Sequence, residues 1–270
     1  MVKPLSHYRR RLAEKGISGI IDSRWRWYKQ SFQMDNWVVG KLVELFGNTI
    51  TVQGVTLSVD NPLITPRYKS SLYFGNYEVA EREFACRYLD RSMPTIEIGA
   101  SIGGVACVTN RLLENPRRHV VVECNPIILP TLEKNRDRNK CQFLIEPVAV
   151  AYRSENVMFS INDFMWGRID PQGERQVSVP VTTLQRLIEK HGFDRINLIS
   201  DCEGTEVDMV ENEPEIFRDR VKCLILETHE AERGREPIAR AISTLESLGF
   251  DIQERHKNRS VLAMINRRSA

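Results

Sequence analysis

The sequence predicts an α/β protein with a doubly wound, mostly parallel sheet, and three observations lead to this fold class. From Pro94 onward, short apolar runs alternate with segments of helical periodicity. Several of these runs end in an acidic residue or a glycine, and the last two runs are separated by only a short polar turn. Alternating strands and helices form parallel sheets covered on both faces, whereas a short turn joins antiparallel strands. The 270 residues, 41% hydrophobic and 27% charged, are enough to bury the core of such a fold.

The chain divides into an N-terminal helical and β-hairpin extension over residues 1–75 and a main domain over residues 76–270. Residues 1–40 contain eight Lys or Arg and three acidic residues, a net charge of +5, interleaved with several aromatic residues. Two interpretations of this segment stay open. It is either a helical extension packed on the main domain by its aromatics, or a peripheral surface that contacts an anionic membrane or a glycolipid.

The elements follow in order from local pattern. Asn48–Asp60 predicts a β-hairpin that turns at Gln53-Gly54, and a loop to Pro66 and a helix over Glu78–Arg91 come next. The predicted parallel strands are Thr95–Gly99, His119–Glu123, Cys141–Val150, Arg195–Asp201 and Val221–Glu227. The predicted helices between and after them are Gly103–Glu114, Ile127–Arg138, Thr183–His191, Glu206–Phe217 (interrupted at Pro214) and Glu236–Leu248. An insertion at about residues 152–182 has the alternation of a second hairpin, and Phe250–Glu254 with Ser260–Ile265 forms an antiparallel closing pair.

Composition restricts the compartment and the partners. The six cysteines are scattered and form no Cys-x-x-Cys pair, so we expect buried free thiols and a reducing, cytoplasmic compartment. The 38 basic and 36 acidic residues nearly balance, so we expect no nucleic-acid partner. No run approaches the ~20 apolar residues of a membrane-spanning helix.

Acidic residues follow four of the predicted strands, at the edge where doubly wound sheets bind ligands: Glu97, Glu123, Asp201 and Glu227. A carboxylate in the position of Glu123 hydrogen-bonds the ribose hydroxyls of a nucleotide-like cofactor. The glycine-containing first loop carries no basic residue, which disfavours a pyrophosphate. An acidic edge suits a cofactor with a positive charge and an adenosine, as in S-adenosylmethionine. Glu97 could instead cap loop amides, and Asp201 with Glu203 could be charges that favour a helix N-terminus.

Several segments in the right order resemble the FkbM family of S-adenosylmethionine-dependent methyltransferases, over about residues 74–230. The matching segments are Gly75-Asn76-Tyr77-Glu78, Glu97-Ile98-Gly99-Ala100-Ser101-Ile102-Gly103, Glu123-Cys124-Asn125-Pro126, Asp201-Cys202-Glu203-Gly204-Thr205-Glu206 and Glu227-Thr228-His229. The sequence departs from the family pattern at three places. Glu97 replaces the usual Asp, Ile199 stands where a lysine is usual, and Leu184-Gln185 replaces Leu-Asp. We therefore assign no catalytic lysine.

The resemblance implies a class I, Rossmann-like methyltransferase domain with sheet order 3-2-1-4-5-7-6. It also implies methyl transfer to a hydroxyl oxygen of a sugar, glycan or natural product. The residues expected to bind the cofactor are Tyr77, Glu78, Glu97, Gly99, Ala100, Ser101, Gly103, Glu123, Cys124, Asn125, Val148, Ala149 and Asp201. The candidate catalytic residues are Asp201, Glu203, Glu227 and His229. A divalent metal is not expected; if one binds, its ligands are Asp201, Glu227 and His229.

Two other functions remain as alternatives. An NAD-linked oxidoreductase would share the doubly wound sheet, but the first loop lacks its Gly-x-Gly-x-x-Gly pattern. A methyltransferase-like binding scaffold without catalysis would use the basic, aromatic N-terminus as its contact surface. The expected partner of the enzyme is a small-molecule or glycan acceptor.

Overall fold

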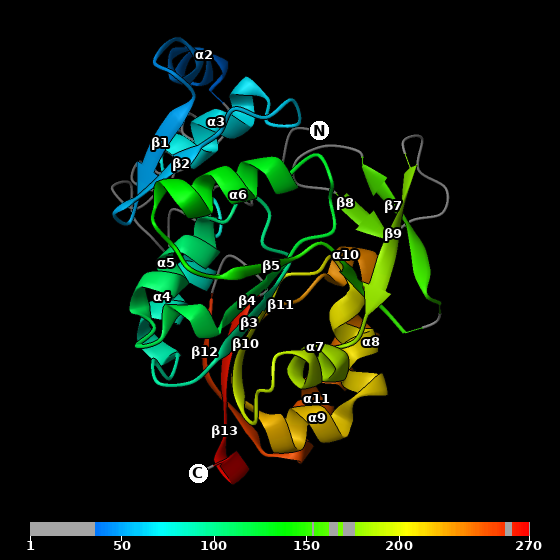
Figure 1. Ribbon diagram of the computed structural model, residues 1–270. Coiled ribbons are helices and arrows are strands. Elements are labelled where there is room, and N and C mark those ends of the chain that lie inside the picture. Colours follow the sequence, from blue (N-terminus) through cyan, green and yellow to red (C-terminus); the bar gives the residue numbers. More distant parts are fainter. Residues whose placement is uncertain (1–35, 153, 162–166, 170–175, 257–260, 270) are drawn as a thin grey trace, which may run out of the picture.

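The computed structural model describes residues 36–152, 154–161, 167–169, 176–256 and 261–269. The interpretations of residues 1–35 therefore lie outside the described residues. A seven-stranded sheet lies at the centre, and a smaller four-stranded sheet and an N-terminal group of elements lie beside it (Figure 1). No helix among the described residues is both long enough and apolar enough to cross a bilayer.

The central sheet has the predicted order. Its strands, from one edge to the other, are β12 (Phe250–Arg255), β13 (Val261–Asn266), β11 (Val221–Glu227), β10 (Ile196–Ser200), β3 (Thr95–Ile98), β4 (His119–Val122) and β5 (Leu144–Glu146). Numbered in chain order within this sheet and read from the β5 edge, the order is 3-2-1-4-5-7-6. The pairs from β5 to β11 are parallel, and β13 runs antiparallel to both of its neighbours.

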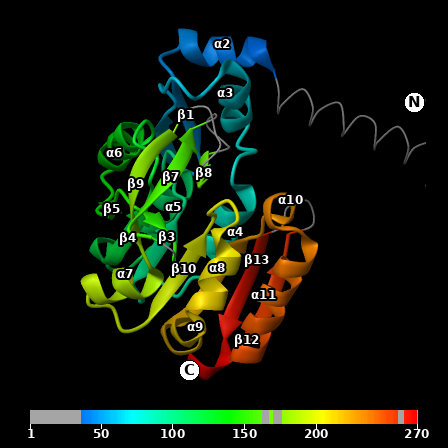
Figure 2. The ribbon, with the colours of Figure 1, turned by 90° about the vertical axis from the view of Figure 1, so that its right-hand side faces the viewer.

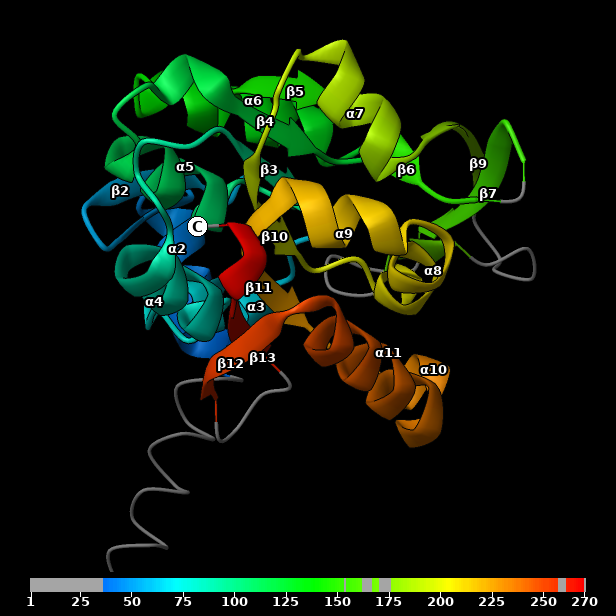
Figure 3. The ribbon, with the colours of Figure 1, turned by 90° about the horizontal axis from the view of Figure 1, so that it is seen from below.

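Helices cover both faces of this sheet, which explains why its central strands β3, β4 and β10 are buried along their whole length. One face packs against α4 (Val79–Tyr88), α5 (Gly104–Leu112) and α6 (Leu129–Arg138). The other face packs against α7 (Leu184–Lys190), α8 (Thr205–Asn212), α9 (Pro214–Arg220) and α11 (Arg235–Leu248). Figure 3 shows the two groups of helices on opposite sides of the strands. A four-residue helix, α10 (Glu230–Arg233), precedes α11, and short 3-10 turns lie at Pro116–Arg118 and Arg267–Ser269.

The described part of the N-terminal extension consists of α2 (Trp37–Leu45), a hairpin of β1 (Thr49–Val52) and β2 (Val55–Ser58), and α3 (Pro66–Tyr73). Both turn residues of the hairpin, Gln53 and Gly54, have positive φ, as a tight two-residue hairpin requires. The predicted hairpin is confirmed. Helix α3 was not predicted: Thr65 caps its N-terminus and Pro66 occupies its first position, so the proline begins a helix where a loop was expected.

The insertion forms the smaller sheet, ordered β6 (Ala149–Val150), β9 (Gln176–Thr182), β7 (Asn156–Ile161) and β8 (Gly167–Ile169). Its predicted hairpin is confirmed, because β7 pairs with β9 in antiparallel register. The prediction of one strand over Cys141–Val150 was wrong. Strand β5 ends at Glu146, because Pro147 has no N–H to donate to a neighbouring strand. The chain next forms strand β6, which pairs with β9 in the smaller sheet.

One buried side chain on α6 holds the extension to the main domain. Oδ1 of Asn135 accepts the backbone N–H of Ser58 (2.6 Å), and its Nδ2 donates to the carbonyls of Ser58 (3.1 Å) and Ile102 (2.9 Å). The side chain therefore ties strand β2 of the extension to the loop that follows β3.

We predict that Asn135→Ala lowers the free energy of unfolding by roughly 2–4 kcal/mol, because it removes three buried hydrogen bonds and leaves their backbone partners unpaired. Urea denaturation measures the change. The control is Asn212→Ala, which removes one exposed bond to the carbonyl of Asp208 and should change stability by less than about 0.5 kcal/mol. Equal effects of the two substitutions would contradict the role of Asn135 in holding the extension to the main domain.

Candidate active site

A pocket lies at the carboxyl ends of the central strands, where doubly wound sheets bind their ligands. Its lining comes from the ends of β3, β4 and β10 and from the start of the insertion. The lining residues are Ile98, Gly99, Val122, Glu123, Cys124, Val148, Ala149, Val150, Phe159, Asp201, Cys202, Glu203 and Thr205. The described residues of this lining include three carboxylates and no Lys, Arg or His.

The loop after β3 closes one side of the pocket and depends on a glycine. A Cβ on Gly99 would lie 1.6 Å from the carbonyl oxygen of Asp201, and Gly99 has a φ of +85°. The backbone N–H groups of Gly99 and Ala100 both donate to the carbonyl of Val122 (3.0 and 3.2 Å). Neighbouring strand ends are thus in direct backbone contact here.

Glu123 is buried at the end of β4 and accepts one backbone N–H on each carboxylate oxygen. Ser101 donates to Oε2 (2.8 Å) and Asn125 to Oε1 (2.7 Å). Burial raises the pKa of Glu123 to about 7, and the backbone donors oppose that rise only in part. Each oxygen keeps a further lone pair, so the side chain could accept two more hydrogen bonds from a ligand.

Six of the predicted cofactor-binding residues line this pocket: Gly99, Glu123, Cys124, Val148, Ala149 and Asp201. Ala100, Ser101, Gly103 and Asn125 belong to the same two loops without lining it. Phe159 was missed by sequence reasoning, although its place in an alternating strand of the insertion indicates one inward face. Val150 and Thr205 were missed as well, and their residue types carry no signal.

Three other predicted residues do not line the pocket. Glu97 lies inside β3, only 2% exposed, with Oε2 3.6 Å from Nε2 of His119, and burial raises its pKa. Glu78 is buried against the start of α5, its Oε2 3.1 Å from the point that a Cβ on Gly104 would occupy. Tyr77 lines a separate, smaller pocket. These three side chains lie behind the lining, where burial raises the pKa of each and the nearby charge of Asp201 adds to the rise.

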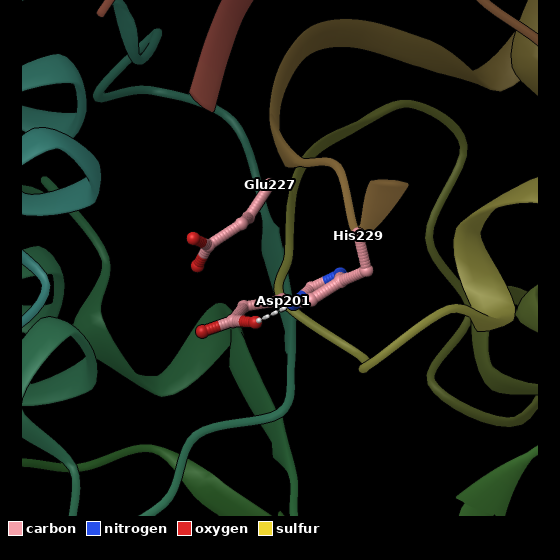
Figure 4. Close-up of side chains that lie close together, drawn as sticks. All are labelled: Asp201, Glu227 and His229. Atoms are coloured by element: carbon pink, nitrogen blue, oxygen red, sulfur yellow. Dashed lines mark ion pairs between the residues drawn. The ribbon is translucent and has the colours of Figure 1, made fainter. Parts of the chain in front are cut away.

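Asp201, Glu227 and His229 lie close together (Figure 4), and Asp201 also lines the pocket. Nε2 of His229 lies 3.3 Å from Oδ1 of Asp201 and 3.7 Å from Oε2 of Glu203. On its other side, Nδ1 of His229 lies 3.1 Å from Oε1 of the buried Glu206, which also accepts the backbone N–H of His229 (2.8 Å). Glu206 therefore fixes the ring so that Nε2 faces the two carboxylates. Sequence reasoning assigned Glu206 no role in the site and missed this contact.

This cluster is rich in buried carboxylates, and the pKa values of its groups are raised. Burial would lower the pKa of His229, but hydrogen bonds to Asp201 and Glu206 raise it to about 11. Burial, followed by the charge of Asp201, raises the pKa of Glu227 to about 10. Burial likewise raises the pKa of Glu203 to about 7, although His229 opposes the rise. The cluster holds a charged histidine and favours any further positive charge.

The same three side chains could hold a divalent cation. Each of Asp201, Glu227 and His229 offers one ligand atom, and these atoms lie within 4.8 Å of one another. A carboxylate on the second nitrogen, as Glu206 provides, is common for histidines that bind metals. These are the residues that the sequence indicated as ligands if a metal binds.

Comparison with known proteins identifies the family. The sequence matches the methyltransferase FkbM domain over residues 97–252. The match spans more than half of the chain, which therefore belongs to the FkbM methyltransferase family. No curated protein matches the chain.

Three solved structures illustrate its structural relatives, each with a TM-score of 0.42. A protein of the NADB-Rossmann superfamily from Streptococcus agalactiae is 10% identical, with 69% of this chain and 67% of that chain covered. The ribosomal protein L11 methylase from Lactobacillus delbrueckii subsp. bulgaricus is 11% identical, with 71% and 80% covered. TYW2 from M. jannaschii, solved in complex with AdoMet, is 13% identical, with 80% and 82% covered.

We predict that Gly99→Ala destabilises the protein by roughly 2–5 kcal/mol, because the new methyl group overlaps a backbone carbonyl and the residue keeps a strained φ. The matched control is Gly192→Ala, at a φ of +61° with no atom within 4 Å of the added Cβ. It should lose only about 1–2 kcal/mol for the left-handed backbone. Urea denaturation compares the two, and a Gly99 variant no less stable than the control would disprove the close approach.

Proposed function

We propose that this member of the FkbM methyltransferase family binds S-adenosylmethionine in the main pocket and methylates a hydroxyl oxygen of a sugar, glycan or natural product. The observation that carries the proposal is the pocket beside Gly99, in which Glu123 ends β4 and carboxylates are the only charged side chains of the described lining. When bound, S-adenosylmethionine supplies a methyl group on a positively charged sulfur.

The pocket fits this cofactor on two counts. The carboxylate of Glu123 has lone pairs left for two ribose hydroxyls after its two backbone contacts. Asp201 and Glu203 favour a positive charge in the same pocket and repel phosphates, and the described lining has no Lys or Arg to offset that repulsion. The same argument disfavours the NAD-linked alternative.

Asp201 and Glu203 are the groups placed to take the proton of the acceptor. A hydroxyl is a weak nucleophile, and a positioned base that removes its proton accelerates transfer. Both carboxylates line the pocket and both face Nε2 of His229. We infer that His229, held by Glu206, positions the pair, and that Glu203 is the base because burial raises its pKa to about 7, in the range that suits proton transfer near neutral pH.

We also propose that the enzyme works in a reducing compartment such as the cytoplasm. All six cysteines are free thiols, and Cys107, Cys141 and Cys223 are buried. Buried unpaired thiols are usual for proteins of reducing compartments.

Glu123→Gln should weaken the binding of S-adenosylhomocysteine by roughly 10- to 100-fold, because hydrogen bonds to a charged acceptor are lost. Titration calorimetry measures this, with Glu133→Gln, an exposed carboxylate on α6, as the control. Because ribose hydroxyls favour the ionised form of Glu123, affinity in the native chain should rise up to roughly tenfold from about pH 6 to about pH 8. The variant should lose this dependence. Binding of NADH but not of S-adenosylhomocysteine would overturn the cofactor assignment.

Glu203→Gln should lower kcat by about 100-fold or more, because it removes the base, while S-adenosylhomocysteine still binds. The assay follows a labelled methyl group from S-adenosylmethionine onto hydroxylated sugars, glycans and natural products. Glu230→Gln, an exposed carboxylate at the start of α10, is the control and should keep full activity. A product methylated on nitrogen or carbon would contradict O-methylation.

The same assay tests the expectation that no metal is needed. Treatment with a chelator should leave the rate unchanged, because Glu203 takes the proton without a metal. A loss that Mg²⁺ or Mn²⁺ restores would instead assign Asp201, Glu227 and His229 as metal ligands.

A further inference from the structure

Helix α2 exposes an apolar face. Eight large hydrophobic side chains of the described residues are exposed, and six of these lie on α2, directly after it, or at the end of α3. The six are Trp37 (55% exposed), Val38 (61%), Leu42 (46%), Leu45 (76%), Phe46 (79%) and Tyr73 (54%). Soluble proteins rarely expose apolar side chains in such a group unless the group contacts something.

The opposite side of α2 is already used for packing. Gly40 and Val43 are its buried residues, and a Cβ on Gly40 would lie 1.7 Å from the carbonyl oxygen of Pro66 at the start of α3. At 3.6 residues per turn, Trp37, Lys41 and Leu45 follow one another along the other side. Neither α3 nor the hairpin can therefore cover the exposed face unless the contact between Gly40 and Pro66 is broken.

Lys41 lies within the apolar face and shows what kind of surface the face suits. Its Nζ is 5.6 Å from the ring centroid of Trp37 and 2.7 Å from Oε2 of Glu44. A long basic side chain beside Trp and Leu on one helical face is typical of helices that lie in the boundary of a lipid bilayer, where the stem contacts acyl chains and the charge reaches the headgroups.

The charge of the adjoining sequence indicates the sign of those headgroups. Residues 1–40 carry a net charge of +5 and lead directly into α2. Basic residues near an anionic leaflet each add about 1 kcal/mol to membrane binding. A partner protein would need a surface that is both negatively charged and apolar in the matching places. An anionic bilayer provides negative headgroups above apolar acyl chains over its whole surface.

We propose that the exposed face of α2 binds the surface of an anionic phospholipid bilayer. Figure 2 shows α2 at one end of the molecule, away from the C-terminus, so a flat surface can reach it. The inference is independent of the methyl acceptor and of the cofactor.

The test is co-sedimentation of the full chain with phosphatidylcholine vesicles, with and without phosphatidylserine. We expect binding to the phosphatidylserine vesicles that weakens as salt is added, since salt screens the electrostatic part. The double variant Leu45→Asp, Phe46→Asp should bind roughly tenfold or more weakly, because two apolar side chains no longer enter the bilayer. Met158→Asp, an exposed apolar position on β7, is the control and should bind like the native chain.

Other occupants of the face give other results, and each of them overturns the proposal. If residues 1–35 cover the face, the native chain stays in solution and only a variant that lacks them sediments with vesicles. If a second copy covers it, the double variant shifts a dimer to a monomer in analytical ultracentrifugation while vesicles bind neither form. Circular dichroism melts show that each variant is folded, and equal vesicle binding by the double variant and the native chain also overturns it.

Discussion

The close approach of two backbones, at Gly99 and Asp201, is the constraint on which the site depends. No side chain fits between them, because a Cβ on residue 99 would lie 1.6 Å from the carbonyl oxygen of Asp201. This contact sets the path of the loop after β3, and that loop presents the N–H of Ser101 to Glu123 at the end of β4. The ends of β3, β4 and β10 thus build one pocket through backbone contacts, so the positions of Glu123 and Asp201 depend little on the conformation of exposed side chains.

The second constraint is electrostatic. Burial raises the pKa values of Glu123 and Glu203 to about 7, and burial with the charge of Asp201 raises that of Glu227 to about 10. The only histidine in the cluster, His229, is hydrogen-bonded to two carboxylates. A positive charge placed beside such carboxylates lowers their pKa values and releases protons, so binding of a cation is linked to proton release. The site is consequently better suited to a cationic ligand than to an anionic one, which agrees with a sulfonium cofactor.

The sequence predicted the strands and what stands at their ends, but not which way each side chain points. The turn at Gln53-Gly54 and the pairing of β7 with β9 follow from local pattern, so they were predictable. The strand order was predicted only through the resemblance to the FkbM family. Ile98 is the last residue of β3 and lines the pocket. Glu97 comes one residue earlier, and because side chains alternate along a strand, its side chain points away from the pocket. Glu206 contacts His229 across 23 positions of sequence, and Phe159 reaches the pocket from the insertion. Such contacts depend on tertiary packing and have no local signature.

The N-terminal extension helps to position the site, because side chains of α6 hydrogen-bond both to the extension and to the loop after β3. Asn135 joins the backbone of Ser58 in β2 to the carbonyl of Ile102 in the loop after β3, and Asn139, one turn further along α6, bonds the backbone of Thr56 in the same strand. Helix α2 packs on α3 through Gly40, on the side opposite to its exposed apolar face. A surface that binds the exposed face would therefore leave the Gly40 contact intact, and the hairpin would stay bonded to α6. It follows that the apolar face can be occupied without disturbing the loop that positions Glu123.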